Sequence, residues 1–313
     1  MEVKLRIHKY KTAVKYGGTE ITMSLLEALF QGIIQGLTEF LPVSSSGHLS
    51  LYQHFTGNNG EGALLFSAIL HLGTLVAVFI AFRKTICGLI VEMFSLIKDV
   101  FTGKFKWKEM NPQRRAIIMM IISLLLLVPF YIFKDYLEGI SEDNDIIIEG
   151  LCFLYTSAIL FISDRCVKGN KKFGDITVKN AVTVGAFQGV ALLPGVSRSG
   201  STISSGLFCG FERTTAVEYS FILGIPAILG GCLLQVKDAV EQKAMDIDFV
   251  NFAVGFVVSA VVGICAIKMV NWLVKSDKFK VFAIYTLILG ILVTGIGIFE
   301  HCVDMNIVDY IRK

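Results

Sequence analysis

The sequence predicts an all-α integral membrane protein with six transmembrane helices and two re-entrant helical hairpins, arranged as an inverted-topology internal repeat. The first observation is composition: of 313 residues, 54% are hydrophobic and 18% are charged, whereas soluble domains carry about 25% charged residues. The second is that the apolar runs have helix length rather than a ten-residue alternation, which favours a helical bundle over a β-barrel. The third is a polar motif that occurs twice within apolar sequence.

The same composition argues against several classes of protein. A net charge of +3 is too small to indicate a nucleic-acid partner, and no P-loop pattern is present. The seven cysteines are scattered without a C-x-x-C pair, so neither a disulfide framework nor a zinc site is indicated. We therefore expect membrane lipids, and no nucleic acid, around this chain.

Residues 1–22 read as a basic N-terminal extension. They lack the apolar core of a signal peptide, and we expect them to have little structural role.

Six later stretches are long and apolar enough to cross a hydrocarbon core of about 30 Å, which takes about 20 helical residues. They are 63–82, 116–133, 146–163, 219–236, 249–267 and 281–299.

Basic residues in the connecting segments predict the orientation of these spans. Eight, five and four Lys or Arg residues lie in 83–115, 164–180 and 268–280, so these segments are expected in the cytoplasm. The other three connections carry one or two each and are expected outside; they are 134–149, 237–248 and 300–313.

The two interrupted stretches, 24–60 and 181–211, must each enter and leave the membrane from one side to fit this orientation. Both are therefore expected to be re-entrant hairpins, from opposite faces. Irregular backbone at membrane depth is tolerated inside protein or along a watery cavity, and such interruptions in two inverted halves indicate a binding site. One observation conflicts, because the basic segment 1–22 would then lie outside.

The predicted organisation is thus an extension followed by two repeats. Repeat A covers 23–163 and repeat B covers 181–299, and each contains one hairpin followed by three spans.

The first hairpin carries a polar stripe. At about 100° per residue, side chains four positions apart share one face of a helix. Pro42 breaks this helix, and the run from Ser44 to His48 is suited to capping a new one, whose free N–H groups would form an anion site. The stripe consists of Glu27, Gln31, Gln35 and Glu39.

The second hairpin repeats this motif without gaps, 153 residues later. Gln35-Gly36 aligns with Gln188-Gly189, and the segment 43–47 aligns with 196–200. The copies differ at three chemically important positions: Glu39 becomes Leu192, Ser45 becomes Arg198, and His48 becomes Ser201. One copy therefore supplies a carboxylate and an imidazole, and the other a guanidinium.

Arg198 needs a partner at this depth, because an Arg at the bilayer centre costs at least about 2.5–3.5 kcal/mol. A structural ion pair with Glu39 is one interpretation, and a bidentate clamp on phosphate is the other. The many neighbouring hydroxyl groups favour phosphate, although small residues also serve helix packing. These hydroxyls belong to Ser44, Ser45, Ser46, Ser197, Ser199, Ser201 and Thr202.

Two further roles follow from the first hairpin. His48, beside serines and a carboxylate, is a candidate proton donor to a leaving group, with a core histidine as the alternative. Glu39 and Gln35, one turn apart, could hold a hard divalent cation through oxygen. His71 is interpreted as structural, and Glu27 is expected at the surface. From the residues alone, hydrolysis and transport of a phosphorylated lipid both stay open.

The two motifs also resemble those of the bacterial undecaprenyl-pyrophosphate phosphatase family, the bacitracin-resistance proteins. That family shows (E/Q)-x-x-x-E before Pro-x-Ser-Ser-x-Gly-His, and then Pro-Gly-x-Ser-Arg-Ser-x-x-Thr. Here the motifs stand at Gln35–Glu39, Pro42–His48 and Pro194–Thr202, and the resemblance covers 23–300. It implies the same six spans and two hairpins.

The resemblance further implies hydrolysis of undecaprenyl diphosphate to undecaprenyl phosphate and inorganic phosphate, which recycles the lipid carrier of peptidoglycan synthesis. It implies a multi-pass protein of the bacterial plasma membrane with its site open to the outer face, and a divalent cation, Mg²⁺ or Ca²⁺. A homodimer stays open as its assembly. A non-catalytic protein that binds bacitracin or lipid is a third hypothesis.

Carried over residue by residue, the resemblance makes Glu39 and His48 catalytic, with Arg198 on the diphosphate and Ser45 at the reacting phosphorus. The expected cation ligands are Glu39 and Gln35, although Gln35 stands where many members have Glu and is a weaker ligand. Whether Ser45 or a water attacks is left open. The expected substrate-binding residues are Ser44, Ser46, Gln188, Ser197, Ser199 and Thr202.

Overall fold

The computed structural model describes residues 24–56, 63–132, 146–193, 195–241, 248–276 and 278–303, with 306, 307 and 310. The extension 1–22 lies outside these residues. In the described part every regular element is helical, apart from an isolated bridge between Lys171 and Phe211. The prediction of an all-α chain is confirmed.

Among the residues that the structure describes, five stretches of helix are long and apolar enough to cross a membrane. They overlap the last five expected spans, so a multi-pass membrane protein is confirmed at this level. The first is Pro112–Phe130, which comprises α5 (Pro112–Leu125) and the start of α6 (Leu127–Ile132). The other four are α8 (Ile147–Asp164), α11 (Arg213–Glu241), α12 (Phe249–Lys275) and α13 (Lys280–Val303).

The remaining expected span, 63–82, is the first in the chain and corresponds to α3 (Ala63–Ala81). It is followed at once by α4 (Arg83–Phe101). The apolar parts of these two helices meet at 89°. The sequence pattern predicts a connecting loop over 83–115, whereas its first 19 residues form α4, and η2 (Trp107–Glu109) and the start of α5 follow. The polar side of α4 packs on α5, where Arg114 contacts Glu92 at 2.6 Å and Asp99 at 2.8 Å.

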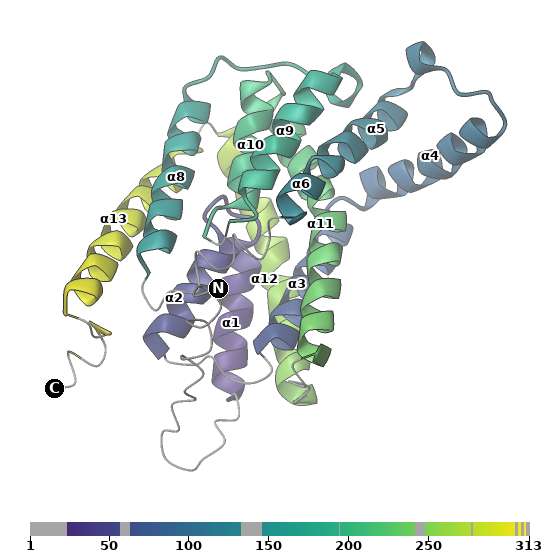
Figure 1. The fold of residues 1–313 in the computed structure, drawn as a ribbon. Coiled ribbons are helices and arrows are strands. Elements are labelled where there is room, and N and C mark those ends of the chain that lie inside the picture. The colour runs from purple at the N-terminus through teal and green to yellow at the C-terminus, as the bar shows by residue number, and fades with distance from the viewer. Residues whose placement is uncertain are drawn as a thin grey trace, which may run out of the picture.

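Each interrupted stretch forms two helices. The first contains α1 (Leu25–Thr38) and α2 (Ser45–Thr56), and the second contains α9 (Val178–Val190) and α10 (Arg198–Phe208). In Figure 1, α1 and α2 occupy the lower half of the bundle and α9 and α10 the upper half, and the turns of the two pairs meet between them. The Oγ of Ser199 donates to the Leu41 carbonyl at 3.0 Å across this junction.

Local sequence explains where these helices begin. Ser24 caps α1 in a reciprocal capping box with Glu27, so Glu27 has a structural role at the helix start. Ser197 caps α10 by accepting from the Gly200 amide at 3.0 Å. Small residues set the close packing of α1 on α12, because a Cβ at Gly36 would lie 2.8 Å from the Ser259 carbonyl oxygen.

Candidate active site

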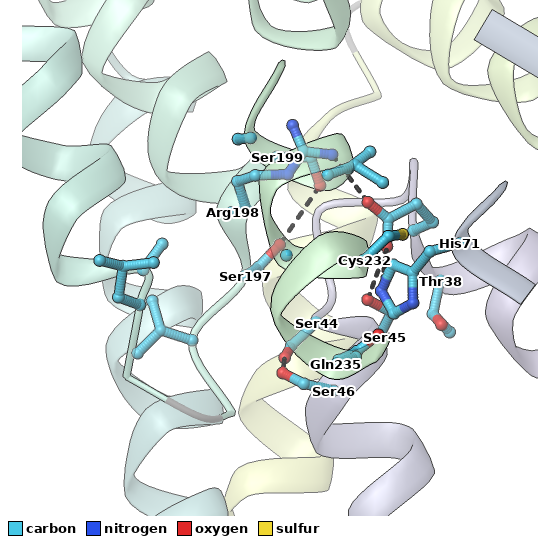
Figure 2. A pocket seen from close by; sticks show the side chains of 17 residues that line it. Thr38, Ser44, Ser45, Ser46, His71, Ser197, Arg198, Ser199, Cys232 and Gln235 are labelled. Atoms are coloured by element: carbon cyan, nitrogen blue, oxygen red, sulfur yellow. Dashed lines mark hydrogen bonds and ion pairs between the residues drawn. The ribbon is translucent and has the colours of Figure 1, made fainter. Parts of the chain in front are cut away.

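A cavity of about 210 Å³ lies where the two turns meet (Figure 2). Its wall comes from the end of α1, the starts of α2 and α10, and the middle of α3 and α11. Seven of the residues predicted for the site line it together. They are Glu39, Ser44, Ser45, Ser46, Ser197, Arg198 and Ser199.

An ion pair joins the two halves of the chain at this cavity. Nη2 of Arg198 lies 2.8 Å from Oε1 of Glu39, whose side chain is almost fully buried. Nη1 of Arg198 also donates to the Ser220 carbonyl at 3.4 Å. Gly224 makes room for the guanidinium, since a Cβ there would overlap it.

The other carboxylate oxygen of Glu39 receives two more donors. Its Oε2 accepts from Nε2 of Gln35 at 3.0 Å and from Oγ of Ser45 at 2.9 Å. Nε2 of His71 lies 3.7 Å from the same oxygen. A serine hydroxyl held on a carboxylate is the contact that an activated nucleophile requires.

Two helix starts converge on the cavity. The α2 helix begins at Ser45 and the α10 helix begins at Arg198, and free N–H groups at helix starts attract anions. Ser44 adopts φ 72°, in the left-handed region that non-glycine residues rarely occupy, and its Oγ accepts from the Gly47 amide at 3.2 Å. Together with Arg198, these groups suit an oxyanion such as phosphate.

Four predicted residues do not line this cavity, and one of them, Gln35, reaches it only through its hydrogen bond to Glu39. The ring of His48 is held between the Ser44 carbonyl, 2.6 Å from Nδ1, and the Tyr285 hydroxyl, 2.7 Å from Nε2. Thr202 contacts the Ser220 hydroxyl at 2.6 Å behind the start of α10. Gln188 is buried, and its amide atoms have no hydrogen-bond partner in the described part of the chain.

The sequence reading also missed part of the wall. His71, Cys232 and Gln235 line the cavity from α3 and α11, but only His71 carries a group that ionises readily near neutral pH. An ionisable residue in the middle of a membrane span is rare and is a functional candidate by default. The position of His71 in the middle of the expected span 63–82 is therefore the sequence feature that could have identified it as a site residue.

The expected cation ligands do not form a complete ion site by themselves. Both oxygens of Glu39 already accept hydrogen bonds, one of them from a guanidinium cation that would repel a metal ion. Gln35 Oε1 is buried without a partner in the described residues, but it supplies one ligand. Mg²⁺ and Ca²⁺ need six or more oxygen ligands.

Comparison with known proteins identifies the relatives of this chain. A family model described as bacitracin resistance protein BacA matches residues 28–292. The chain belongs to the BacA family. The match includes both halves of the cavity and all the lining residues named above.

Curated relatives are similar to this chain over nearly their whole length. Undecaprenyl-diphosphatase 4 of Bacillus thuringiensis subsp. konkukian (strain 97-27) is 39% identical over 272 residues, which cover 87% of this chain and 96% of that protein. Undecaprenyl-diphosphatase of Alkaliphilus metalliredigens (strain QYMF) is 37% identical, covering 87% and 98%. Undecaprenyl-diphosphatase of Methanosphaera stadtmanae is 38% identical, covering 86% and 97%.

Proposed function

We propose that this protein hydrolyses undecaprenyl diphosphate to undecaprenyl phosphate and inorganic phosphate, and so recycles the lipid carrier of cell-wall synthesis. One observation carries the proposal: Ser45 and Arg198 contact the two oxygens of the buried Glu39 carboxylate, in a cavity between two helix starts. The relatives described above bear the name of this activity. Bacitracin resistance, after which the family is named, would follow from the same reaction.

The ion pair between Glu39 and Arg198 explains how substrate binding could make Glu39 a stronger base. Glu39 and Arg198 neutralise each other while the cavity holds no anion. A diphosphate offers Arg198 a bidentate partner, so its binding draws the guanidinium away from Glu39. The carboxylate then becomes a stronger base toward the Ser45 hydroxyl that it already contacts.

The chemical step transfers the terminal phosphoryl group to Ser45 Oγ or to a water. A new O–P bond forms as the bridging P–O bond breaks, the proton of the nucleophile passes to Glu39, and lipid phosphate leaves. If Ser45 attacks, Glu39 gives up this first proton, then accepts a proton from the water that attacks the phosphoserine and returns it to the Ser45 oxygen as the serine O–P bond breaks. The N–H groups that begin α2 and α10 stabilise the charge on the phosphoryl oxygens.

Glu39 and Gln35 would hold Mg²⁺ or Ca²⁺ together with oxygens of the substrate. Mg²⁺ in particular is usually held by one or two carboxylates plus substrate phosphates. Such a cation would neutralise charge on the phosphoryl group.

The proposal includes the arrangement in the membrane. The two helix pairs are taken as re-entrant hairpins from opposite faces of the plasma membrane, within an inverted repeat, and the cavity as opening to the outer face. The first residues of α2 and α10, Ser45 and Arg198, are 153 residues apart, which is the offset of the sequence repeat. The meeting of the two turns in Figure 1 supports this arrangement.

Purified protein in detergent tests the activity directly. With a polyprenyl diphosphate, inorganic phosphate and lipid monophosphate are expected in equal amounts, in the presence of Mg²⁺ or Ca²⁺ and less with EDTA. Folded protein that releases no phosphate with either cation, but moves the lipid across a vesicle membrane, would support transport instead.

A further inference from the structure

We propose that His71 is a further catalytic residue of this site, the proton donor to the lipid phosphate that leaves. The inference rests on the proposed hydrolysis. It assigns the role of proton donor to the leaving group, which the sequence indicates for His48, to His71 of α3.

The first support is the position of the ring. His71 lines the cavity with 23% of its side chain exposed, and its Nε2 lies 3.7 Å from Oε2 of Glu39. The same Oε2 accepts from Ser45 at 2.9 Å, and Figure 2 shows the His71 ring beside Ser45. A separation of 3.7 Å is too long for a direct hydrogen bond, so the facing nitrogen is available to a ligand.

The second support is that the ring has a fixed orientation. Nδ1 lies 2.8 Å from the Ser67 carbonyl oxygen, one turn earlier on α3. A carbonyl oxygen can only accept a hydrogen bond, so Nδ1 carries hydrogen in both charge states. Nε2 is therefore the nitrogen whose proton can leave, and it is the nitrogen that faces Glu39.

The third support comes from the internal repeat, which extends without gaps into α3 and α11. Ser67 corresponds to Ser220 and His71 to Gly224, each 153 residues apart. The Ser67 carbonyl anchors the imidazole, and the Ser220 carbonyl contacts the guanidinium of Arg198. Where repeat A has His71, repeat B has a glycine whose missing side chain makes room for Arg198. The two halves thus place an imidazole and a guanidinium on equivalent carbonyl anchors.

His48, by contrast, has both ring nitrogens engaged outside the cavity, by the Ser44 carbonyl and the Tyr285 hydroxyl. Its ring also packs edge-on against Phe153. These contacts suit a residue that holds the left-handed turn at Ser44 in place.

The proposed step balances as follows. The nucleophile gives its proton to Glu39 Oε2 while its oxygen bonds to the terminal phosphorus. The bridging P–O bond breaks, its electron pair stays on the oxygen of the lipid phosphate, and that oxygen takes the proton from Nε2 of the His71 imidazolium. The proton on Glu39 then returns to Nε2, which restores both groups for the next turnover.

The test compares His71→Gln with His54→Gln in detergent-purified protein. Gln places an amide nitrogen near the position of Nε2 but cannot transfer a proton, and His54 pairs with Glu300 at the far end of α2. His71→Gln is expected to lower kcat by about 100-fold or more, with KM and the affinity for farnesyl methylenediphosphonate changed less than about threefold. His54→Gln is expected to keep the wild-type kcat.

His71→Asn is the second variant, because its amide can keep the bond to the Ser67 carbonyl while removing the group that faces Glu39. The inference would be overturned if either His71 variant folds and keeps the wild-type kcat. It would also be overturned if both variants fail to fold, because His71 would then have a structural role. Absence of phosphate release from the wild type would instead overturn the proposed function, so the two failures are distinguishable.

Discussion

Glu39 is the residue on which the contacts of the cavity converge. One carboxylate oxygen pairs with Arg198, and the other accepts from Gln35 and Ser45 and faces His71. Buried charges of this kind are costly unless they are paired. The ion pair can therefore stabilise the fold before substrate binds. After substrate binds, Arg198 can contact the diphosphate and Glu39 can accept the proton of the nucleophile.

Glu39→Gln is expected to lower kcat by about 100-fold or more, because the proton acceptor is lost. It is also expected to lower the melting temperature in detergent, since removing one partner of a buried pair costs about 3–5 kcal/mol. Phosphate release and thermal unfolding measure the two effects.

A diphosphonate ligand separates these effects further. It should raise the melting temperature of Glu39→Gln by more than that of the wild type, because it supplies the unpaired Arg198 with a new anionic partner. An equal rise in both proteins would contradict the exchange of partners at Arg198.

At the residue scale, the motifs were enough to predict that Glu39, Ser45 and Arg198 meet. Their positions follow from the polar stripe, the helix break and the repeat, all of which are local patterns. The roles of the histidines were harder to assign. Whether His48 or His71 faces the cavity depends on how α2 and α3 are rotated about their axes against the neighbouring helices. This rotation cannot be derived from the spacing of residues in the sequence.

Among the elements, α1 is held in place by its contact with α12. Gly32 and Gly36 lie one turn apart on this contact, and a Cβ on Gly36 would approach the Ser259 carbonyl oxygen to 2.8 Å. Small residues allow helices to approach closely in membranes, where packing drives association. The contact fixes the end of α1, and with it Gln35 and Glu39.

Gly36→Ala is expected to destabilise the protein by about 1–3 kcal/mol, as overpacking does, and to reduce phosphate release because Glu39 shifts. Gly230→Ala is the matched control in α11, where an added Cβ meets no atom within 4 Å. Replacing a helical glycine there should leave stability unchanged or raise it by about 0.5–1 kcal/mol. Thermal unfolding in detergent compares the variants, and equal melting temperatures would contradict the close contact.

The element that sequence analysis misjudged is α4. Its charged residues placed 83–115 among the connections, and the charge count was useful for orientation. However, Glu92, Ser95 and Asp99 lie on one side of the helix, where Arg114 of α5 contacts all three. The opposite side exposes apolar residues such as Ile90 and Ile97. A polar stripe satisfied by a neighbouring helix looks like a loop when only composition is counted.

For the whole molecule, five of the six predicted spans coincide with helical stretches of the described residues that are long and apolar enough to cross a membrane, and the other, 63–82, is α3 of the bent pair α3 and α4. Orientation rests on the basic residues of the connections. Two exposed positions suit a test: Asn170, in the connection between α8 and α9, and Lys237, in the last turns of α11.

In a variant without the seven native cysteines, Lys237→Cys is expected to react with an impermeant maleimide on intact cells. Asn170→Cys is expected to react only after permeabilisation. The reverse pattern would contradict the proposed topology and the outward opening of the cavity.

The most direct measurement for the central claim is phosphate release from a polyprenyl diphosphate by wild-type protein, Arg198→Lys and Arg198→Ala, with folding checked by thermal unfolding. We expect Arg198→Ala to lose activity by about 100-fold or more and Arg198→Lys to recover only part of it, because lysine keeps the charge but lacks the bidentate fork. Wild-type turnover by folded Arg198→Ala would contradict the claim that the cavity between the two turns is the phosphatase site.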